Sequence, residues 1–346
     1  MVRPIKCLIW DLDNTLWDGT LMEGDPCIIK PGLKSVLKRL DGRGILHSIA
    51  SKNDPAPALR LLKKKGVDRL FLHPQIGWIS KPASIQNIAN KLNIDLDSVG
   101  FIDDEPYELE QVRKLLPQVR VYNSRECLDL PRRPELNPPF MTDESTRRRQ
   151  MYQQEARKSQ IRRSSGMSQK EFLKFCRMKM TIRIARNDDM DRIMELMHRA
   201  HQMNATGIIY SSRQVSSFIS DPRYRLYVVE LRDRFVDYGK VGLAICNLND
   251  RKWQLKSFLL SCRVLSRGIA FIFILWLQNQ AFKSGAAEIE GIYKKRPRNR
   301  RMLMLYRLSG FKPSEGNGNG TQIFRARCKK KFKVPEWLTL KEAGHL

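Results

Sequence analysis

The sequence has no long apolar run, no closely paired cysteines and few acidic residues for its length. The longest apolar stretch, 268–277, is too short to span a bilayer, and the N-terminus shows no secretory signal pattern. The seven cysteines are scattered and form no Cys-x-x-Cys pair, which argues against a zinc site or a disulfide framework. These absences exclude a membrane-spanning protein and a disulfide-stabilised secreted domain, and they predict a cytoplasmic location.

The shortage of acidic residues leaves the chain strongly basic. There are 63 Lys and Arg residues against 36 Asp and Glu residues, which gives a formal net charge of +27. Such a field either indicates an acidic partner (nucleic acid, anionic membrane or acidic protein) or simply keeps the protein soluble. With 346 residues, of which 42% are hydrophobic, the chain can form one to three domains.

The N-terminal part of the chain alternates apolar strands with amphipathic helices. The expected strands are 5–10, 45–50, 70–72, 99–102 and 119–122, and the expected helices are 32–42, 57–65, 81–92 and 108–115. Strands that alternate with helices indicate a doubly wound parallel sheet. We therefore predict an α/β domain over residues 1–133.

Polar side chains follow three of these strands, and a lysine begins one of the helices. The residues are Asp11, Asp13, Thr15, Ser51, Lys81, Asp103 and Asp104. Because the carboxyl ends of parallel strands meet at one edge of a sheet, we expect these side chains to converge on one crevice. Neighbouring carboxylates repel each other unless a cation lies between them, and Mg²⁺ prefers oxygen ligands. The sequence therefore predicts a magnesium site that also binds phosphate.

The chemistry that this set fits is phosphoryl transfer. Asp11 is expected to attack phosphorus and form an aspartyl-phosphate. Asp13 is expected to protonate the leaving oxygen and then to activate water. The alternative for the pair is two solvated acids in a turn before a helix.

The other residues of the set are expected to bind the ion and the phosphate. The predicted metal ligands are Asp11, the backbone carbonyl of Asp13, and Asp103, with Asp104 beside them. Thr15, Ser51 and Lys81 are the predicted phosphate-binding residues. Taken singly, Ser51 could be a helix cap and Lys81 a surface lysine.

This arrangement resembles the haloacid dehalogenase-like (HAD-like) phosphatases over residues 1 to about 125. Four segments resemble the FkbH-like branch in particular, namely 11–17 (DLDNTLW), 51–54 (SKND), 76–81 (IGWISK) and 102–110 (IDDEPYELE). The resemblance implies a fused enzyme of polyketide or related assembly-line pathways. It also implies a substrate, 1,3-bisphosphoglycerate, whose three-carbon unit loses phosphate and is delivered as a glyceryl group to an acyl carrier protein.

Between the two halves of the chain lies a polar, basic and strongly helical stretch. Residues 132–179 contain 13 basic and five acidic residues, a net charge of +8. We expect a helical linker over 134–180. It is a connector packed on both halves, a docking surface for a phosphopantetheinylated acidic carrier protein, or only a solvated charged helix. No RNA-binding module or basic–aromatic signature is present, so nucleic acid is not the expected partner.

A second domain is expected over 181–332, followed by a C-terminal tail at 333–346. Its expected strands are 181–185, 227–231, 241–246, 253–261, 287–293 and 322–326, with helices from 188, 268 and 299. This order resembles the mixed α/β fold of GNAT acyltransferases. In that fold a strand leads to a loop and helix N-terminus that hold the pantetheine pyrophosphate, and 263–268 is the matching segment. Ser266 stands where the fold usually has glycine.

Four residues of the second domain are candidates for the transfer reaction. Cys262, at a strand end, could carry a glyceryl thioester, with Arg263 and Arg267 raising its nucleophilicity; the alternative is a buried free cysteine. The arginines and Asn299, at the start of the fold's terminal helix, are the predicted substrate-binding residues.

The leading hypothesis is a Mg²⁺-dependent bifunctional enzyme. It would release phosphate from a phosphorylated three-carbon acyl donor and load a glyceryl-type unit onto a carrier protein. The alternatives are a coenzyme A-dependent acyltransferase with a vestigial or separate phosphatase domain, and a basic nucleic-acid-binding protein on a HAD-like scaffold.

Overall fold

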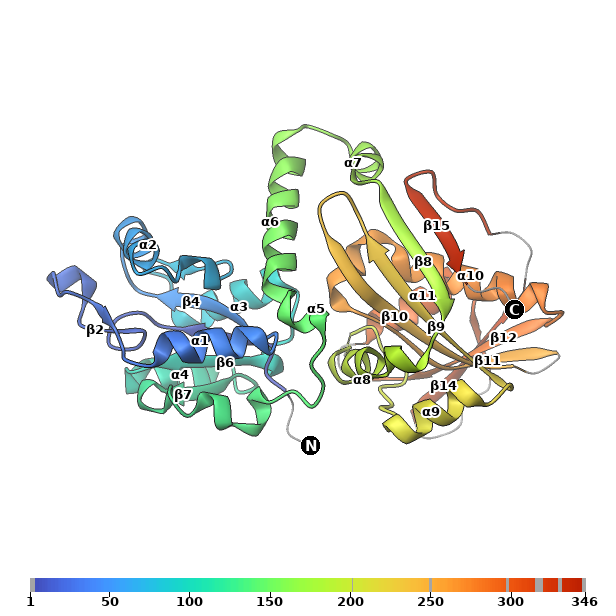
Figure 1. Ribbon diagram of the computed structural model, residues 1–346, viewed down its shortest axis with the longest axis horizontal. Helices are drawn as coiled ribbons and strands as arrows, with labels where there is room; N and C mark the ends of the chain where they lie inside the picture. Colours follow the sequence, from blue (N-terminus) through green and yellow to red (C-terminus); the bar gives the residue numbers. More distant parts are fainter. Residues whose placement is uncertain are drawn as a thin grey trace. The chain divides into compact units, whose positions relative to one another are not determined.

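The computed structural model describes residues 4–200, 202–248, 251–296, 299–314, 320–328 and 332–343, without the side chains of residues 265 and 266. The chain divides into two compact units, residues 1–156 and 157–346. Each unit contains its own sheet (Figure 1). The four-part division drawn from the sequence stays a prediction, because a division into two units does not test the ends of a linker or a tail.

The N-terminal unit is built on a five-stranded parallel sheet with strand order β5-β4-β1-β6-β7. Its strands are β1 (Cys7–Trp10), β4 (Leu46–Ser51), β5 (Gln75–Ile76), β6 (Val99–Asp103) and β7 (Arg120–Asn123). Its helices include α1 (Leu33–Gly42), α2 (Pro55–Lys64), α3 (Lys81–Leu92) and α4 (Pro106–Leu115). A small hairpin, β2 (Trp17–Asp18) and β3 (Ile28–Ile29), follows β1.

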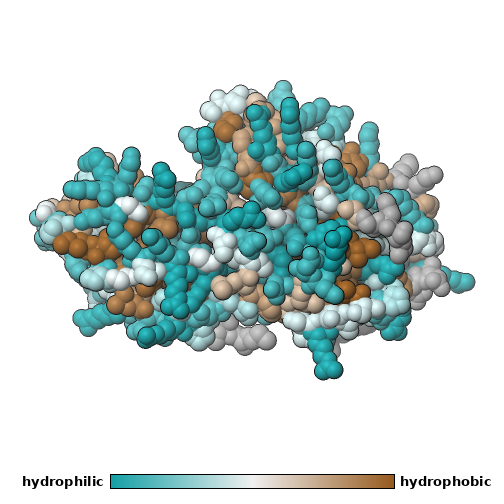
Figure 2. Space-filling model, in the orientation of Figure 1, coloured by the Kyte–Doolittle hydropathy of each residue, from teal (hydrophilic) through white to brown (hydrophobic). Residues whose placement is uncertain are grey.

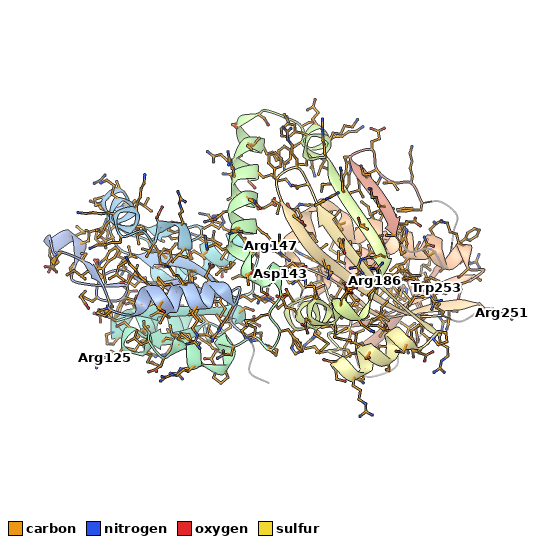
Figure 3. All side chains as sticks on the ribbon, viewed as in Figure 1. Arg125, Asp143, Arg147, Arg186, Arg251 and Trp253 are labelled. Carbon is orange, nitrogen blue, oxygen red and sulfur yellow. The ribbon has the colours of Figure 1, made fainter. Side chains whose placement is uncertain are left out.

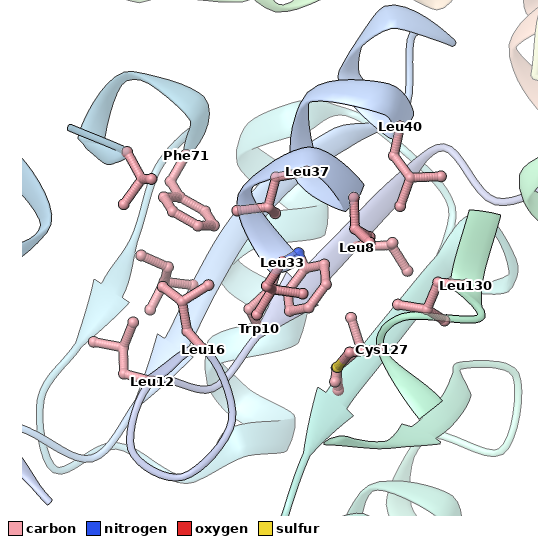
Figure 4. Packing of buried hydrophobic residues seen from close by; sticks show 14 of the residues in the cluster. Leu8, Trp10, Leu12, Leu16, Leu33, Leu37, Leu40, Phe71, Cys127 and Leu130 are labelled. Atoms are coloured by element: carbon pink, nitrogen blue, oxygen red, sulfur yellow. The ribbon is translucent and has the colours of Figure 1, made fainter. Parts of the chain in front are cut away.

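Alternation along β1 explains why helices cover both faces of this sheet. Leu8 and Trp10 belong to a buried cluster with residues of α1 and α2. The close view shows them near Leu33 and Leu37 of α1 (Figure 4). Cys7 and Ile9 belong to a second buried cluster with residues of α3 and α4. A strand buried on both sides is apolar at every position, which is the pattern of this segment. The predicted doubly wound parallel fold is therefore confirmed.

The C-terminal unit contains an eight-stranded mixed sheet with strand order β13-β14-β12-β11-β10-β9-β8-β15. Its strands are β8 (Met178–Ile184), β9 (Tyr224–Arg232), β10 (Asp237–Asn247), β11 (Lys252–Leu260), β12 (Glu288–Lys294), β13 (Lys312–Pro313), β14 (Thr321–Arg327) and β15 (Leu338–Ala343). The pairs β11–β12 and β8–β15 are parallel, and the other pairs are antiparallel. Its helices are α7 (Gln169–Cys176), α8 (Met190–Arg199), α9 (Ser212–Ser220), α10 (Ile269–Lys283) and α11 (Arg300–Leu308). The expected mixed α/β fold is confirmed.

Sequence patterns missed β15 and placed the last strand at 322–326. In β15 only Leu338 is buried and most other residues are exposed, so the segment lacks an alternating apolar pattern. It joins the sheet through backbone pairing with β8, from Leu338 opposite Met178 to Ala343 opposite Arg183. Backbone pairing leaves little trace in side-chain chemistry, which is why a strand lies within the segment expected to be a tail.

The basic stretch is helical, as expected, but it is not one solvated helix. It forms α5 (Asp143–Thr146), which Arg147 ends, and α6 (Arg148–Ser164) (Figure 3). Within the C-terminal unit, Lys158 of α6 forms a buried ion pair with Asp233. A buried ion pair needs a defined geometry, because each charge loses its hydration. At least this part of the stretch therefore packs as core.

The face of the molecule drawn in Figure 2 is covered mainly by hydrophilic side chains, with smaller hydrophobic patches between them. This agrees with the high content of charged residues. In the described part of the chain, no helix is both long enough and apolar enough to cross a bilayer.

A histidine lies inside the core of the N-terminal unit. His47 of β4 is 0% exposed, and its Nδ1 accepts a hydrogen bond from the indole of Trp10 at 3.1 Å. Its Nε2 lies 3.0 Å from the carbonyl oxygen of Leu37, so Nε2 must carry the hydrogen and donate it. The ring is thus neutral, and burial lowers the pKa of His47 to about 4.

We predict that this histidine makes the N-terminal unit less stable in acid. An unfolded histidine has a pKa near 6.5, so the unfolded state binds more protons between about pH 6.5 and 4. The free energy of unfolding should be unaffected above pH 6.5 and fall by up to about 3 kcal/mol as the pH drops to 4. Denaturant unfolding followed by tryptophan fluorescence at several pH values measures this.

The matched variants are His47→Gln and His73→Gln, because His73 is only half-buried. The first should flatten the pH dependence over this range, and the second should change it less. An unchanged pH slope in His47→Gln would contradict the assignment.

Candidate functional site

Three adjacent strands end at one edge of the N-terminal sheet and carry the predicted site. β1 lies between β4 and β6 and pairs with both in parallel. The register continues past the last paired residues, because the amide of Asp11 donates to the carbonyl oxygen of Ile102 at 2.9 Å. Asp11, Ser51 and Asp103 therefore lie at the carboxyl ends of three neighbouring strands, where ligands bind in open α/β sheets.

An acidic cluster lies at this edge. The cluster consists of Asp11, Asp103 and Asp104, whose carboxylate oxygens lie within 4.8 Å of one another. Local hydrogen bonds hold two of these side chains. Thr15 donates from its hydroxyl to Oδ1 of Asp104 at 2.9 Å, and the amide of Glu105 donates to Oδ1 of Asp103 at 3.0 Å.

Lys81 places one positive charge among these carboxylates. It is 3% exposed and comes from the first residue of α3. Its Nζ forms an ion pair with Asp11, donates to the carbonyl oxygen of Ala50 at 2.9 Å, and lies 3.0 Å from Oδ2 of Asp103. The contact with Asp103 is close but poorly aligned, so Oδ2 of Asp103 is buried without a good hydrogen bond among the described residues.

Burial and charge perturb the pKa values of these groups. Burial raises the pKa of Asp11 far above its usual range, Lys81 and a hydrogen bond from Ser51 oppose this, and the charge of Asp103 adds to it. Burial also raises the pKa of Asp103, against the influence of Lys81. For Lys81, burial lowers the pKa, but the two carboxylates outweigh burial and leave it above its usual value.

This donor set fits a magnesium ion. One ammonium group among three carboxylates leaves two negative charges uncompensated, which is the charge that one divalent cation neutralises. The ligand atoms are all oxygens, and the buried Oδ2 of Asp103 has spare acceptor capacity.

Of the four aspartates predicted at this edge, Asp13 is the one that lies outside the acidic cluster. Its Oδ1 accepts hydrogen bonds from the indole of Trp17 at 2.8 Å and from the amide of Leu21 at 3.2 Å. Its Oδ2 accepts from the side-chain amide of Asn53 at 2.8 Å. The expected metal contact of Asp13 was through its backbone carbonyl, which these contacts do not involve.

The structure thus brings Thr15, Ser51 and Lys81 into contact with the acidic cluster, whereas Asp13 is held by separate contacts. Thr15 was expected to bind phosphate, but its hydroxyl is used to orient Asp104. Sequence reasoning missed Trp17 and Asn53. Both stand inside the quoted segments 11–17 and 51–54, but an indole or a primary amide carries no chemical signal of its own until its neighbour is known.

In the C-terminal unit, Cys262 is half-buried. It is the first residue of the turn η8 (Cys262–Arg267), which follows β11 and is capped by Ser261. Arg263 donates from Nε to the hydroxyl of Ser261 at 3.2 Å. Arg267 donates to the carbonyl oxygen of Arg263, and its guanidinium lies 4.5 Å from the ring centre of Tyr238. Both arginines therefore contact the fold itself, and the side chain of Ser266 lies outside the described residues.

Asn299 was predicted to bind substrate, and here the structure differs. Its side chain is 0% exposed; the amide nitrogen donates to the carbonyl oxygens of Asn204, Ala205 and Lys294, and the amide oxygen accepts from the hydroxyl of Tyr293. With its hydrogen-bonding groups used within the protein, Asn299 instead holds a backbone segment in place.

That segment, residues 203–205, fills the space where β11 and β12 part. The two strands pair only as far as Leu255 and Gly291. Beyond that point Leu260 donates to the carbonyl oxygen of Met203 at 3.0 Å, and Lys294 donates to that of Ala205 at 3.0 Å. The chain therefore supplies backbone hydrogen-bond partners to both strands where they part.

Comparisons with solved structures find partial likenesses to each unit. The ribosomal-protein-S18-alanine N-acetyltransferase from Escherichia coli is 17% identical and matches 45% of this chain and 97% of its own, with a TM-score of 0.35. The N-terminal part of the protein BF1531 from Bacteroides fragilis, described as containing a phosphatase domain complexed with Mg, is 30% identical. It matches 37% of this chain and 39% of its own, with a TM-score of 0.32.

Comparison of sequences identifies one family. No family model matches the chain. Magnesium-dependent phosphatase 1 from Homo sapiens is 30% identical in an alignment of 134 residues, and the match covers 33% of this chain and 76% of the human protein. At the ends of β1 and β6 the chain has an acidic cluster of carboxylate oxygens, the type of ligand that Mg²⁺ prefers. It therefore belongs to the HAD-like magnesium-dependent phosphatase family.

Proposed function

We propose that the N-terminal unit hydrolyses phosphate esters with Asp11 as the nucleophile. The observation that carries this proposal is the acidic cluster, in which Asp11 and Asp103 are buried and Asp104 is partly buried, with Lys81 in contact with two of its members. Asp11 is 7% exposed at the end of the central strand, and its ion pair with Lys81 gives the carboxylate the fixed position that a nucleophile needs.

In this mechanism an oxygen of Asp11 forms a bond to phosphorus while the bond from phosphorus to the ester oxygen breaks. Asp13 gives a proton to the departing oxygen, and later takes one from the water that attacks the aspartyl-phosphate. Inorganic phosphate leaves and Asp11 is regenerated. Lys81 and Ser51 hold the phosphoryl oxygens during both steps.

Asp11, Asp103, Asp104 and the backbone carbonyl of Asp13 would hold Mg²⁺ at this edge. When bound, the ion would supply positive charge to the phosphoryl oxygens and to the carboxylates that burial leaves uncompensated.

We predict that Asp11→Asn abolishes phosphate release, because an amide cannot act as the nucleophile. The loss should be at least about 1,000-fold in kcat with p-nitrophenyl phosphate and Mg²⁺, a size typical of the removal of a covalent catalyst. The control is Asp18→Asn, which changes an exposed aspartate of the nearby hairpin and should leave the rate within about 2-fold. Retained activity in Asp11→Asn would reject this nucleophile.

We propose that the full reaction is that of an FkbH-like enzyme. The substrate would be a phosphorylated three-carbon acyl donor of the 1,3-bisphosphoglycerate type, and a glyceryl-type unit would pass in the C-terminal unit to an acyl carrier protein. The thiol of Cys262 would attack the acyl carbon and form a thioester while the bond from that carbon to the acyl-phosphate oxygen breaks and phosphate leaves. The thiol of the carrier would then attack the thioester carbon, take the acyl group and release the thiol of Cys262. The remaining phosphate ester of the three-carbon unit would be hydrolysed at Asp11. The partly accessible thiol at the end of β11 supports this role.

An acidic carrier protein would find cationic side chains on α6 and α7. Arg162, Arg163, Lys170 and Lys174 are exposed there. A groove of about 570 Å³ lies beside α7, lined by Leu173, Lys333 and Trp337 among others. Exposed cations around a partly apolar groove suit an acidic protein surface, and they support this choice of partner.

We predict that incubation with 1,3-bisphosphoglycerate, Mg²⁺ and an acidic holo carrier protein adds a glyceryl group to the carrier, detected by intact mass. Cys262→Ala should abolish the adduct, whereas Cys328→Ala, which changes the other half-buried cysteine, should not. No adduct on any of several acidic carriers would reject the substrate, and an adduct formed by Cys262→Ala would reject the covalent role. Coenzyme A and RNA in place of the carrier test the two alternative functions.

A further inference from the structure

The carboxylate of Asp13 is held from two directions by groups with no assigned role. The indole nitrogen of Trp17 and the amide of Leu21 donate to Oδ1 at 2.8 and 3.2 Å. The side-chain nitrogen of Asn53, which follows β4, donates to Oδ2 at 2.8 Å. These are the hydrogen bonds of this carboxylate among the residues that the structure describes.

The two carboxylate oxygens of Asp13 differ in the number of acceptor sites that remain free. A carboxylate oxygen accepts about two hydrogen bonds. Oδ1 has two donors already, from Trp17 and Leu21, so it has no free acceptor site. Oδ2 has a single donor, from Asn53, and keeps one site free.

The two side-chain donors are built into the core. Trp17 and Asn53 are both 0% exposed, and Trp17 belongs to the buried cluster beneath α1. The side-chain oxygen of Asn53 is buried with no hydrogen-bond partner among the described residues. An unpaired buried oxygen costs about 1–3 kcal/mol, and reversing the amide would set that oxygen against the carboxylate of Asp13. The orientation of Asn53 is therefore fixed by its contact with Asp13.

We propose that Trp17 and Asn53 are positioning residues that make Oδ2 of Asp13 the oxygen that transfers the proton. This inference rests on the proposed phosphatase function and specifies its general acid. The hydrogen bond from Trp17 helps to fill the acceptor sites of Oδ1, so this oxygen does not take up the proton. The hydrogen bond from Asn53 fixes the direction in which the free acceptor site of Oδ2 points. Without either donor the carboxylate can rotate, and the proton no longer meets the departing oxygen.

The test uses the dependence of rate on the leaving group. General-acid help matters most when the departing oxygen is a poor leaving group, as in phenyl phosphate, and least for p-nitrophenyl phosphate, which is close to it in size. The quantity measured is kcat/KM, because it reports the step in which the ester bond breaks. A variant that merely distorts the pocket lowers kcat/KM for both esters alike.

Trp17→Phe and Trp10→Phe form a matched pair. Each removes one buried indole N–H, but Trp10 donates to His47 in the core instead of to Asp13. We expect Trp17→Phe to lower kcat/KM about 10- to 100-fold for phenyl phosphate and less than about 3-fold for p-nitrophenyl phosphate. Trp10→Phe should change the two values by the same factor. Asn53→Leu removes the donor on the other side and should repeat the pattern of Trp17→Phe.

Equal losses on both esters in Trp17→Phe and Asn53→Leu would overturn the proposal, as would the same leaving-group effect in Trp10→Phe. If Trp17→Phe does not fold, Asn53→Leu decides alone. Failure of the proposed function gives a different result. The wild-type protein would then hydrolyse neither ester, and its rates would equal those of Asp11→Asn.

Discussion

The arrangement of the N-terminal unit depends on one buried electrostatic contact, that of Lys81 with Asp11 and Asp103. Each of these charges loses most of its hydration at the sheet edge, at an effective cost of several kcal/mol per ion. The ammonium group offsets part of this cost but not all of it, and the raised pKa of Asp11 is the consequence. The remaining imbalance of charge suits the site to a divalent cation.

The strand order makes this contact possible. With β1 between β4 and β6, the first residue after the central strand lies beside the ends of both neighbours. Helix α3 begins with Lys81 and is buried along the side that contains Ile85 and Ile88, so the lysine is carried on a packed element. The fold thus fixes charged groups by burying the apolar residues next to them. The free energy gained by this burial offsets the electrostatic cost of the buried charges, so the unit stays folded.

The C-terminal unit uses its polar side chains differently. Asn299 and Arg267 donate to backbone carbonyl oxygens of the protein, and Arg263 donates to the hydroxyl of Ser261. Residues 203–205 occupy the strand edges that β11 and β12 leave free. An extended ligand with amide groups that formed hydrogen bonds to those strand edges would compete with this segment. We propose that the reactive group of this unit is the half-buried thiol of Cys262.

The sequence alone determined the α/β fold of the first unit and the identity of its acidic cluster, because apolar runs that end in carboxylates are local patterns and parallel strands share one edge. It also indicated the mixed strands and helices of the second unit. It did not reveal β15, whose pairing is made by the backbone, or the burial of Asn299. Only the tertiary structure decided that Thr15 orients Asp104 and that Trp17 and Asn53 hold Asp13. The reason is physical: a hydroxyl, an indole or an amide can serve many partners, and its role depends on which group the fold brings within hydrogen-bonding distance.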